Sequence, residues 1–251
     1  MEQQLKGKSA LVTGASRGIG AATAIALARA GAGPITIQYN SYRHGAERTV
    51  EAIAALGAKA SAIQADFSRM EGIGVFLREV DFKVDILVNN AGDLIKRARL
   101  AEVTPDLYDQ VMALNTKSAF FITQAVVPYM IERKSGVVVF VSSIAARNGG
   151  GIGAAVYAAA KSAVLCLTRG LARELGPHGI RVNGVSPGTV DNYFHEKHNT
   201  PAILENMRTQ TVCGRLGTNE EVADGIVFLC SHESRYIYGQ TIEINGDMYM
   251  M

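Results

Sequence analysis

Short apolar runs of strand length alternate with longer segments of helical pattern along most of the chain. The runs are rich in Val and Ile on both faces, which is typical of strands in a central parallel sheet covered by helices. Strict alternation of strand and helix predicts right-handed crossovers and one α/β domain with a doubly wound sheet of about seven strands, helices lying on both faces. The predicted strands are 9–13, 35–39, 60–64, 84–88, 137–141, 180–185 and 241–244. The predicted helices are 18–30, 45–56, 73–80, 105–133 (interrupted near Asn115), 154–175 and 218–230.

One segment, between Pro187 and about Gly217, does not follow this alternation of strand and helix. It is long, polar and mixed in composition, which suits a lid or substrate loop more than core packing. We expect substrate selectivity to lie at about 189–215. No linker, repeat or low-complexity segment is visible, so residues 1–251 are predicted to form a single domain.

Composition narrows the function classes. Of the 251 residues, 48% are hydrophobic and 19% charged, which allows a sizeable core and excludes disordered, collagen-like and coiled-coil proteins. The net charge is +2 without a block of like charges, so we predict no nucleic-acid and no membrane partner. The longest uncharged stretch, 118–131, falls short of the roughly 18 apolar residues that span a membrane. Residues 1–8 are polar and lack the apolar core of a signal peptide, which predicts a cytoplasmic protein.

The cysteines and histidines give no metal pattern. Cys166, Cys213 and Cys230 are odd in number and far apart, which predicts reduced, buried thiols in the cytosol. Only His195 and His198 approach ligand-like spacing, and no cysteine or carboxylate partner supports them beyond the adjacent Glu196. We predict no metal site.

A glycine-rich segment, TGASRGIG at 13–20, follows the first predicted strand and opens a helix. Gly14 would permit the tight turn, Gly18 would let the backbone approach a pyrophosphate, and Gly20 would let helix and sheet pack closely. The helix N-terminus would add free N–H groups and a positive dipole end. The alternative is a purely structural turn in a chain with 26 glycines. The strand-turn-helix context favours a dinucleotide site.

The end of the second strand bears on which dinucleotide binds. An acid there would hold the ribose 2′-hydroxyl and repel a 2′-phosphate, but none appears before Glu47. Asn40 and Ser41 can donate hydrogen bonds to a phosphate, and Arg17 and Arg43 can supply charge. The sequence therefore favours NADP over NAD. Alternatively, the two arginines, Arg43 above all, are solvated surface residues.

Tyr157 and Lys161 are spaced by four residues in a predicted helix, so they share one face. A neighbouring cation favours the phenolate and would lower the tyrosine pKa. Such a phenol can exchange a proton with a carbonyl or alcohol oxygen. Chance alone also places Tyr and Lys four apart on many helices.

Two further polar residues strengthen this interpretation. Ser143 follows the fifth predicted strand, at the carboxyl edge where doubly wound sheets place their ligands. Asn115 interrupts an otherwise apolar helical stretch, where it could bond a backbone carbonyl or a water and kink the helix. A surface amide is the alternative for Asn115.

Taken together, these motifs resemble those of the short-chain dehydrogenase/reductase family, from about Leu5 to Gly246. Within it the chain is most similar to the 3-oxoacyl-acyl-carrier-protein reductases and related ketone or polyol oxidoreductases. The matching pieces are TGASRGIG at 13–20, Asp66, NNAG at 89–92, Asn115, Ser143, YAAAK at 157–161, Pro187-Gly188 and Gly239-Gln240.

The resemblance implies a Rossmann-type fold, a homotetramer and a catalytic tetrad. Tyr157 would be the general acid in reduction and the base in oxidation. Lys161 would lower the tyrosine pKa and hold the nicotinamide ribose, Ser143 would polarise the substrate carbonyl, and Asn115 would fix a water leading to Lys161.

The resemblance also implies where the cofactor lies. Asp66 and Phe67 would contact the adenine, and residues 188–190 would meet the carboxamide end. The full set predicted to hold NADP is Gly14, Ser16, Arg17, Gly18, Ile19, Gly20, Asn40, Ser41, Asp66, Phe67, Asn90, Ala91, Gly92, Tyr157, Lys161, Pro187, Gly188 and Val190.

Several functions stay open. The predicted reaction is NADP-dependent interconversion of a small-molecule carbonyl and an alcohol, on a 3-oxoacyl-acyl-carrier-protein, a sugar or polyol, or a small polar ketone. The alternatives are a catalytically silent nucleotide-binding regulator and an epimerase or dehydratase of the same fold. A carrier protein would need a basic patch, for which the candidates are Arg97, Arg99, Arg133, Lys134 and Arg147. Alternatively, these five basic residues are separate, solvated surface residues.

Apolar residues cover more than one face of the predicted helix 154–175. One stripe contains Val164 and Leu171, and a second contains Ala163, Cys166 and Gly170. Since one face must cover the sheet, the other is free for a second subunit.

Overall fold

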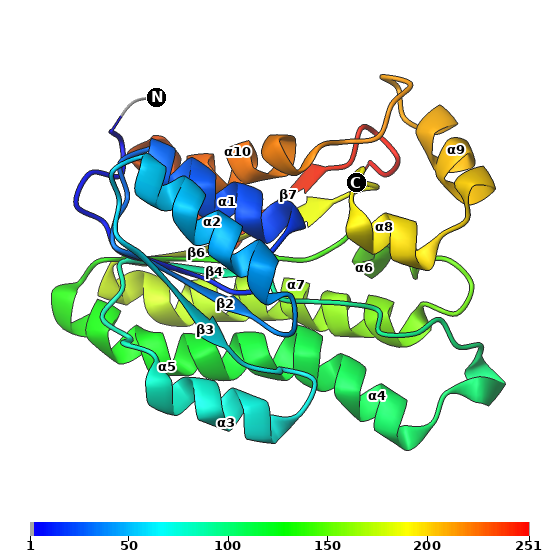
Figure 1. Cartoon of the computed structure of the whole chain (residues 1–251), viewed down its shortest axis with the longest axis horizontal. Helices are drawn as coiled ribbons and strands as arrows, with labels where there is room; N and C mark the ends of the chain where they lie inside the picture. Colours follow the sequence, from blue (N-terminus) through cyan, green and yellow to red (C-terminus); the bar gives the residue numbers. More distant parts are fainter. Residues whose placement is uncertain (1–2, 251) are drawn as a thin grey trace.

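Seven parallel strands form the sheet in the order β3-β2-β1-β4-β5-β6-β7 (Figure 1). The computed structural model describes residues 3–250. The strands are β1 (Ala10–Val12), β2 (Ile35–Tyr39), β3 (Ala60–Gln64), β4 (Ile86–Asn89), β5 (Gly136–Val141), β6 (Ile180–Pro187) and β7 (Thr241–Ile244). The predicted doubly wound α/β fold is confirmed. The predicted span 1–251 includes Met1, Glu2 and Met251, which lie outside the described residues.

Helices cover both faces of the sheet (Figure 1). On one face lie α1 (Gly18–Arg29), α2 (Arg43–Ala55) and α10 (Asn219–Cys230). On the other lie α3 (Met70–Glu79), α4 (Pro105–Met112), α5 (Ser118–Arg133) and α7 (Ala155–Leu175). Alternate strand residues serve the two layers: Val12 packs in the core with Leu27, whereas Leu11 packs in the core with Phe76. This two-sided burial explains the continuous apolar runs of the strands.

The order of the strands reverses beside β1, since β2 lies on one side of it and β4 on the other. The chain leaves β1 through the glycine turn and leaves β4 through Asn89, so both exits meet at the carboxyl edge of the sheet. Ligands of open α/β sheets bind in the crevice at such a switch point.

The predicted interruption near Asn115 is present as one π-helical turn, Ala113–Lys117, between α4 and α5. The segment 189–215, predicted as a loop, instead contains α8 (Tyr193–His198) and α9 (Pro201–Thr209). Side chains cap both helices, Asn192 through the amide of Phe194 and Thr200 through that of Ile203. A short helix α6 (Ala145–Asn148) after β5 was also not predicted.

The prediction of three buried thiols is wrong for two of them. Cys230 is buried, whereas Cys166 and Cys213 are exposed. Cys166 lies on a face of α7 that residues 3–250 leave exposed, and Cys213 lies in the turn that follows α9.

The described residues contain neither a candidate membrane span nor a candidate metal cluster. None of their helices has the length and apolar character needed to cross a membrane. Within residues 3–250, no three His, Cys, Asp or Glu side chains are grouped so that they could hold a metal ion.

Candidate active site

A cavity of about 670 Å³ opens at the carboxyl edge of the sheet, between the glycine turn after β1 and the segment that carries α8 and α9. The predicted residues that line it are Gly14, Ser16, Arg17, Gly18, Ile19, Gly20, Asn40, Ser41, Phe67, Asn90, Ala91, Gly92, Ser143, Tyr157, Lys161, Pro187, Gly188 and Val190. Only Asp66 and Asn115 of the predicted set are not part of its lining. Asp66 accepts a hydrogen bond from the lining residue Asn40, and the side-chain oxygen of Asn115 lies against the lining residue Gly92.

Close backbone packing explains the glycines of the turn. Gly14 has a φ of +65°, and a Cβ there would lie 2.8 Å from the Cα of Ala91. Gly18 has a φ of +60° and lines the cavity, and a Cβ there would lie 3.7 Å from Oδ1 of Asn219 and 3.8 Å from Nδ2 of Asn192, which is ordinary contact. A Cβ on Gly20 would collide with the carbonyl oxygen of Gly14 and the side chain of Asn90. The three roles predicted for these glycines therefore fit the geometry.

Side-chain hydrogen bonds hold the turn in place. The amide of Gly14 donates to Oε1 of Gln38 at 2.8 Å, and Nε2 of Gln38 donates to the carbonyl of Ala65 at 2.7 Å. Asn90 donates from Nδ2 to the carbonyls of Thr13 and Gly14 at 2.9 and 3.0 Å. These hydrogen bonds fix the turn to β2 on one side and to the segment after β4 on the other.

The N-terminus of α1 is suited to a pyrophosphate. Its N-cap residue, Arg17, makes no side-chain cap, and no acidic residue lies in the first turn. The first amides of the helix therefore keep free N–H groups beside the cavity, and the helix dipole favours an anion there.

The end of the cavity where the adenosine is predicted to lie is framed by Arg17. Its guanidinium lies 4.1 Å from the ring centroids of both Tyr42 and Tyr193, so two aromatic faces hold it. Asn40 donates to Oδ1 of Asp66 at 3.5 Å, which links the two predicted adenosine contacts. Arg43 is exposed at the start of α2 and does not line the cavity, so its expected charge contribution is not found.

Tyr157 and Lys161 are buried in the first turns of α7, with 9% and 3% of their surface exposed. The ammonium lies 5.8 Å from the centroid of the phenol ring, and Nζ donates to the carbonyl of Val141 at 2.8 Å. The two groups therefore share one face of the helix, as the spacing predicts.

The expected lowering of the tyrosine pKa by Lys161 is wrong for this structure. Burial raises the pKa of Tyr157 to about 12, and the charge of Asp93 adds to this, whereas the Ser143 side chain only partly offsets it. Burial also lowers the pKa of Lys161 to about 8. Desolvation disfavours both charged forms, which outweighs an attraction between an ammonium and a phenolate.

Asn115 is 1% exposed and lies behind the cavity wall. Its Nδ2 donates to the carbonyls of Asp93 and Val111 at 2.9 Å each, which supports the π-turn. Its Oδ1 is buried without a hydrogen-bond partner. A Cβ on Gly92 would lie 2.6 Å from this oxygen and 2.8 Å from Nζ of Lys161, so the three groups meet at one point. The surface-amide alternative for Asn115 is excluded.

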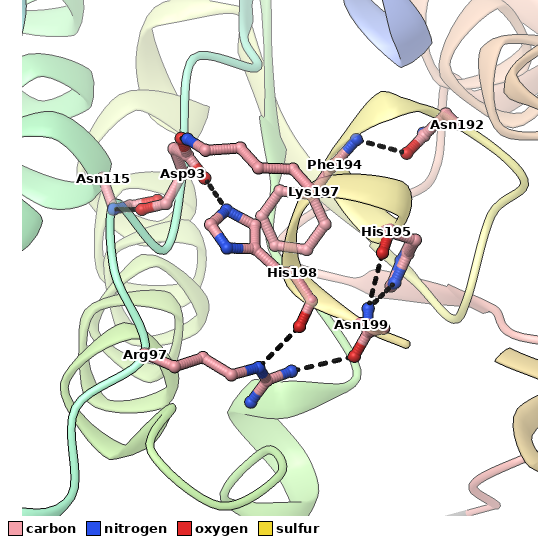
Figure 2. A network of polar contacts seen from close by, with 9 residues as sticks. All are labelled: Asp93, Arg97, Asn115, Asn192, Phe194, His195, Lys197, His198 and Asn199. Carbon is pink, nitrogen blue, oxygen red and sulfur yellow. Dashed lines mark hydrogen bonds and ion pairs between the residues drawn. The ribbon is translucent and has the colours of Figure 1, made fainter. Parts of the chain in front are cut away.

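Helix α8 contributes Phe194, His195 and Lys197 to the cavity lining, and Figure 2 shows the helix beside the loop that carries Asp93 and Arg97. Its Phe194 ring is 5.8 Å from that of Tyr157. Asp93 accepts from Lys197 and pairs with Nε2 of His198, both at 2.6 Å. Burial alone would raise the pKa of Asp93, but these two hydrogen bonds outweigh it and lower the pKa to about 2. The α8 segment is therefore tied to the loop after β4 by charge.

Cavity residues that the sequence did not assign to the site include Gln38, Asp93, Arg97 and Phe194. Asp93 had a usable signal, since it is a carboxylate directly after the NNAG motif. Arg97 was assigned only to the candidate basic patch. Nothing in the sequence links either residue to α8, because the partners lie about a hundred positions away.

The candidate basic patch does not form as a unit. Arg97 lines the cavity, Arg147 is paired with Glu243 at 2.9 Å, and Arg133 lies 3.9 Å from Asp85. Asp85 directly precedes β4, so Arg133 lies at the amino edge of the sheet and Arg97 at the carboxyl edge. The predicted patch is therefore not supported, and the alternative of a solvated surface does not describe Arg97 and Arg147, which are only partly exposed.

Comparison with known proteins agrees with this geometry. The family described as "Enoyl-(Acyl carrier protein) reductase" matches residues 14–248. The 3-oxoacyl-[acyl-carrier-protein] reductase FabG of Staphylococcus aureus is 37% identical over 97% of this chain and 98% of its own. Among solved structures, the angucycline C-6 ketoreductase LanV with bound NADP is 32% identical, covers 99% of this chain and 98% of its own, and has a TM-score of 0.90. A 3-oxoacyl-[acyl-carrier protein] reductase with bound NAD from Brucella melitensis is 33% identical, with 100% and 94% covered and a TM-score of 0.89.

His195 of α8 gives a test of how the segment is packed. Burial first, then the charges of His198 and Arg97, lower the pKa of His195 from 6.5 to about 4. The folded state thus disfavours protonation of His195. The stability that the neutral imidazole contributes above pH 6.5 is therefore lost as the pH falls toward 4. Between pH 7 and pH 5 we expect His195 to account for about 1–2 kcal/mol of lost unfolding free energy.

Urea denaturation of the wild type and of His195→Gln at both pH values measures this loss. His232→Gln, at an exposed histidine, is the control. An unchanged pH dependence in His195→Gln would show that the imidazole titrates normally.

Proposed function

Because this chain belongs to the short-chain dehydrogenase/reductase family, we propose that it is an NADP-dependent oxidoreductase that interconverts a small carbonyl compound and an alcohol. The observation that carries this proposal is the placement of Tyr157, Lys161 and Ser143 around one end of the cavity. The phosphate-binding turn lies at the other end, so a dinucleotide bound there can extend to the tyrosine.

Bound nicotinamide supplies the hydride in the reducing direction and accepts it in the oxidising one. Tyr157 completes the reduction, because its O–H bond breaks as the proton passes to the carbonyl oxygen. A pKa near 12 keeps the phenol protonated until the substrate oxygen gains negative charge. In this state the side chain has a proton to donate in reduction, whereas in oxidation it must first lose that proton.

Ser143 and Lys161 position the reacting groups. The Ser143 hydroxyl accepts from the amide of Ala145 at 3.1 Å, which fixes the side chain and leaves its O–H to orient the substrate oxygen. Lys161 and the unpartnered Oδ1 of Asn115 meet under Gly92. A water held between them would return a proton toward Tyr157, and the same ammonium would hold the ribose.

The preference for NADP rests on the absence of an acid at the end of β2. Asn40 and Ser41 stand there instead, with Arg17 held by its two tyrosines. These groups favour a 2′-phosphate, whereas the solved relatives carry NADP in one case and NAD in another. The lining residues of the phosphate turn fit either dinucleotide.

For the substrate, we favour a small polar ketone or hydroxy compound over an acyl chain on a carrier protein. Asn148, Asn192, Asn199 and Lys197 line the cavity near the tetrad, together with the apolar Phe194. The basic residues that a carrier protein would need are not gathered on one surface. A silent nucleotide-binding regulator is an alternative, and it predicts NADPH binding without oxidation by any carbonyl compound.

We further propose a cytoplasmic homotetramer. Cys166 and Gly170 lie exposed on α7, and a Cβ on Gly170 would meet no atom within 4 Å. On α5, Phe120 is 36% exposed and packs edge-on against Phe121 at 5.5 Å. Two uncovered helix faces suit two subunit contacts.

Replacing Tyr157 by Phe removes the proposed acid and leaves the aromatic ring. We expect NADPH affinity to be retained and kcat for carbonyl reduction to fall by roughly 10²–10⁴-fold. NADPH absorbance against a panel of ketones measures the loss, and fluorescence titration measures cofactor binding. Tyr236→Phe, at a side chain 96% exposed, is the control. Retained turnover in Tyr157→Phe would remove the assigned acid.

Replacing Arg17 by Ala tests the 2′-phosphate. Because a charge-assisted hydrogen bond contributes roughly 1.5–3 kcal/mol, we expect NADPH to bind about tenfold or more weakly and NADH to change little. Arg43→Ala, outside the cavity, should change neither. Equal losses for both cofactors in Arg17→Ala would contradict the proposed preference.

A charge placed on the exposed face of α7 tests the assembly. We expect sedimentation of the wild type at micromolar concentration to show a tetramer, and Cys166→Arg to dissociate it by burying a charge in the contact. Ala54→Arg on exposed α2 is the matched control. A monomeric wild type would overturn the proposal.

A further inference from the structure

The α8 segment and the loop after β4 form one polar network (Figure 2). Within it, Arg97 donates from Nε to the carbonyl of His198 at 2.8 Å and from Nη2 to Oδ1 of Asn199 at 3.0 Å. Its Nη1 donates to the carbonyl of Ile152 at 2.9 Å. Three fixed contacts therefore hold the guanidinium in place.

All three acceptors of Arg97 are neutral. No ion pair among residues 3–250 includes Arg97, although its side chain lines the catalytic cavity. A guanidinium carries five N–H groups, and these contacts use three of them. One N–H on each terminal nitrogen is left, which is the pair that a carboxylate accepts in the bidentate arrangement.

The other charges of the cavity do not neutralise Arg97. Asp93 is the one carboxylate in the lining that the structure describes, and it is already bonded to Lys197 and His198. His195, whose imidazole has a pKa near 4, is neutral at physiological pH. With Asp93 paired to Lys197, the positive charge of Arg97 remains uncompensated at the substrate end.

Contacts through α8 connect Arg97 to Tyr157, the proposed proton donor. Phe194 packs on Tyr157 at 5.8 Å and on the ring of His198 at 5.0 Å, and the carbonyl of His198 accepts from Arg97. The ring of Tyr157 and the guanidinium of Arg97 both contact α8, and both side chains line the same cavity. A substrate in that cavity would present its carbonyl to the phenol and an anionic group to the guanidinium.

We propose that Arg97 binds a carboxylate of the substrate, so that the enzyme reduces small, polar oxo acids. This inference rests on the proposed function, which leaves the substrate class open. An acyl thioester on a carrier protein has no carboxylate for Arg97, so it is the class that the arrangement disfavours.

The test compares short oxo acids, acetoacetate and levulinate, each with its methyl ester, using NADPH. Each pair differs in charge while the reacting ketone is the same. We expect kcat/KM of the wild type to favour the acids by roughly ten- to a hundredfold. In Arg97→Gln the ratio of acid to ester should fall to near one, mainly through KM for the acid. Arg97→Lys, which keeps the charge without the fork, should restore part of the ratio.

Arg99→Gln is the matched control, because Arg99 is exposed and does not line the cavity. Its ratio should equal that of the wild type. If Arg97→Gln only disturbs α8, acid and ester will lose activity together and the ratio will persist, which overturns the proposal. A wild type that reduces acid and ester equally also overturns it, and leaves the carbonyl reductase function standing.

Calorimetric titration of levulinate and its ester into the protein saturated with NADP⁺ separates the two proposals. Acid binding that is tighter than ester binding, and that Arg97→Gln abolishes, supports the carboxylate site even if no ketone is reduced. In that case the proposed catalytic function fails and the binding inference stands. Equal binding of acid and ester would reject the inference.

Discussion

Desolvation of two ionisable groups on α7 is the constraint on which the site depends. Tyr157 and Lys161 are both buried, and each is held toward its uncharged form. Raising a phenol from a pKa of 10 to about 12 corresponds to about 3 kcal/mol in favour of the protonated state. The chain therefore prepares a buried proton donor at the wall of the cavity. In the protein alone the phenolate is disfavoured, because burial outweighs the hydrogen bond from Ser143.

The surroundings of these two residues are built for that complex. The glycine turn is fixed by Gln38 and Asn90, and the first turn of α1 keeps its amides free. Asn115 uses its amide nitrogen to support the π-turn and leaves its oxygen unpartnered next to Lys161. A buried polar atom without a partner costs free energy, so its retention at this point is consistent with a functional role.

Charge also decides how the cavity is covered. The two hydrogen bonds of Asp93 attach α8 to the body of the domain, and Phe194 brings an apolar surface onto the phenol. Arg97 takes part in the same network without a carboxylate of its own. In the proposed enzyme, the same few residues would therefore cover the catalytic end and select the substrate.

Sequence alone was sufficient where the information is local. The pattern of apolar residues predicted the strands, and the glycines predicted the turn after the first strand. Four-residue spacing predicted the shared face of Tyr157 and Lys161, and a polar residue in an apolar helix predicted the break at Asn115. Tertiary structure decided the pKa of the phenol, because desolvation depends on what covers a residue and not on its neighbour four positions away. It also decided the helices within 189–215, the separation of the basic residues and the pairing of Asp93 and Arg97 with α8. Those contacts join segments about a hundred residues apart, and only the folded sheet brings the segments together.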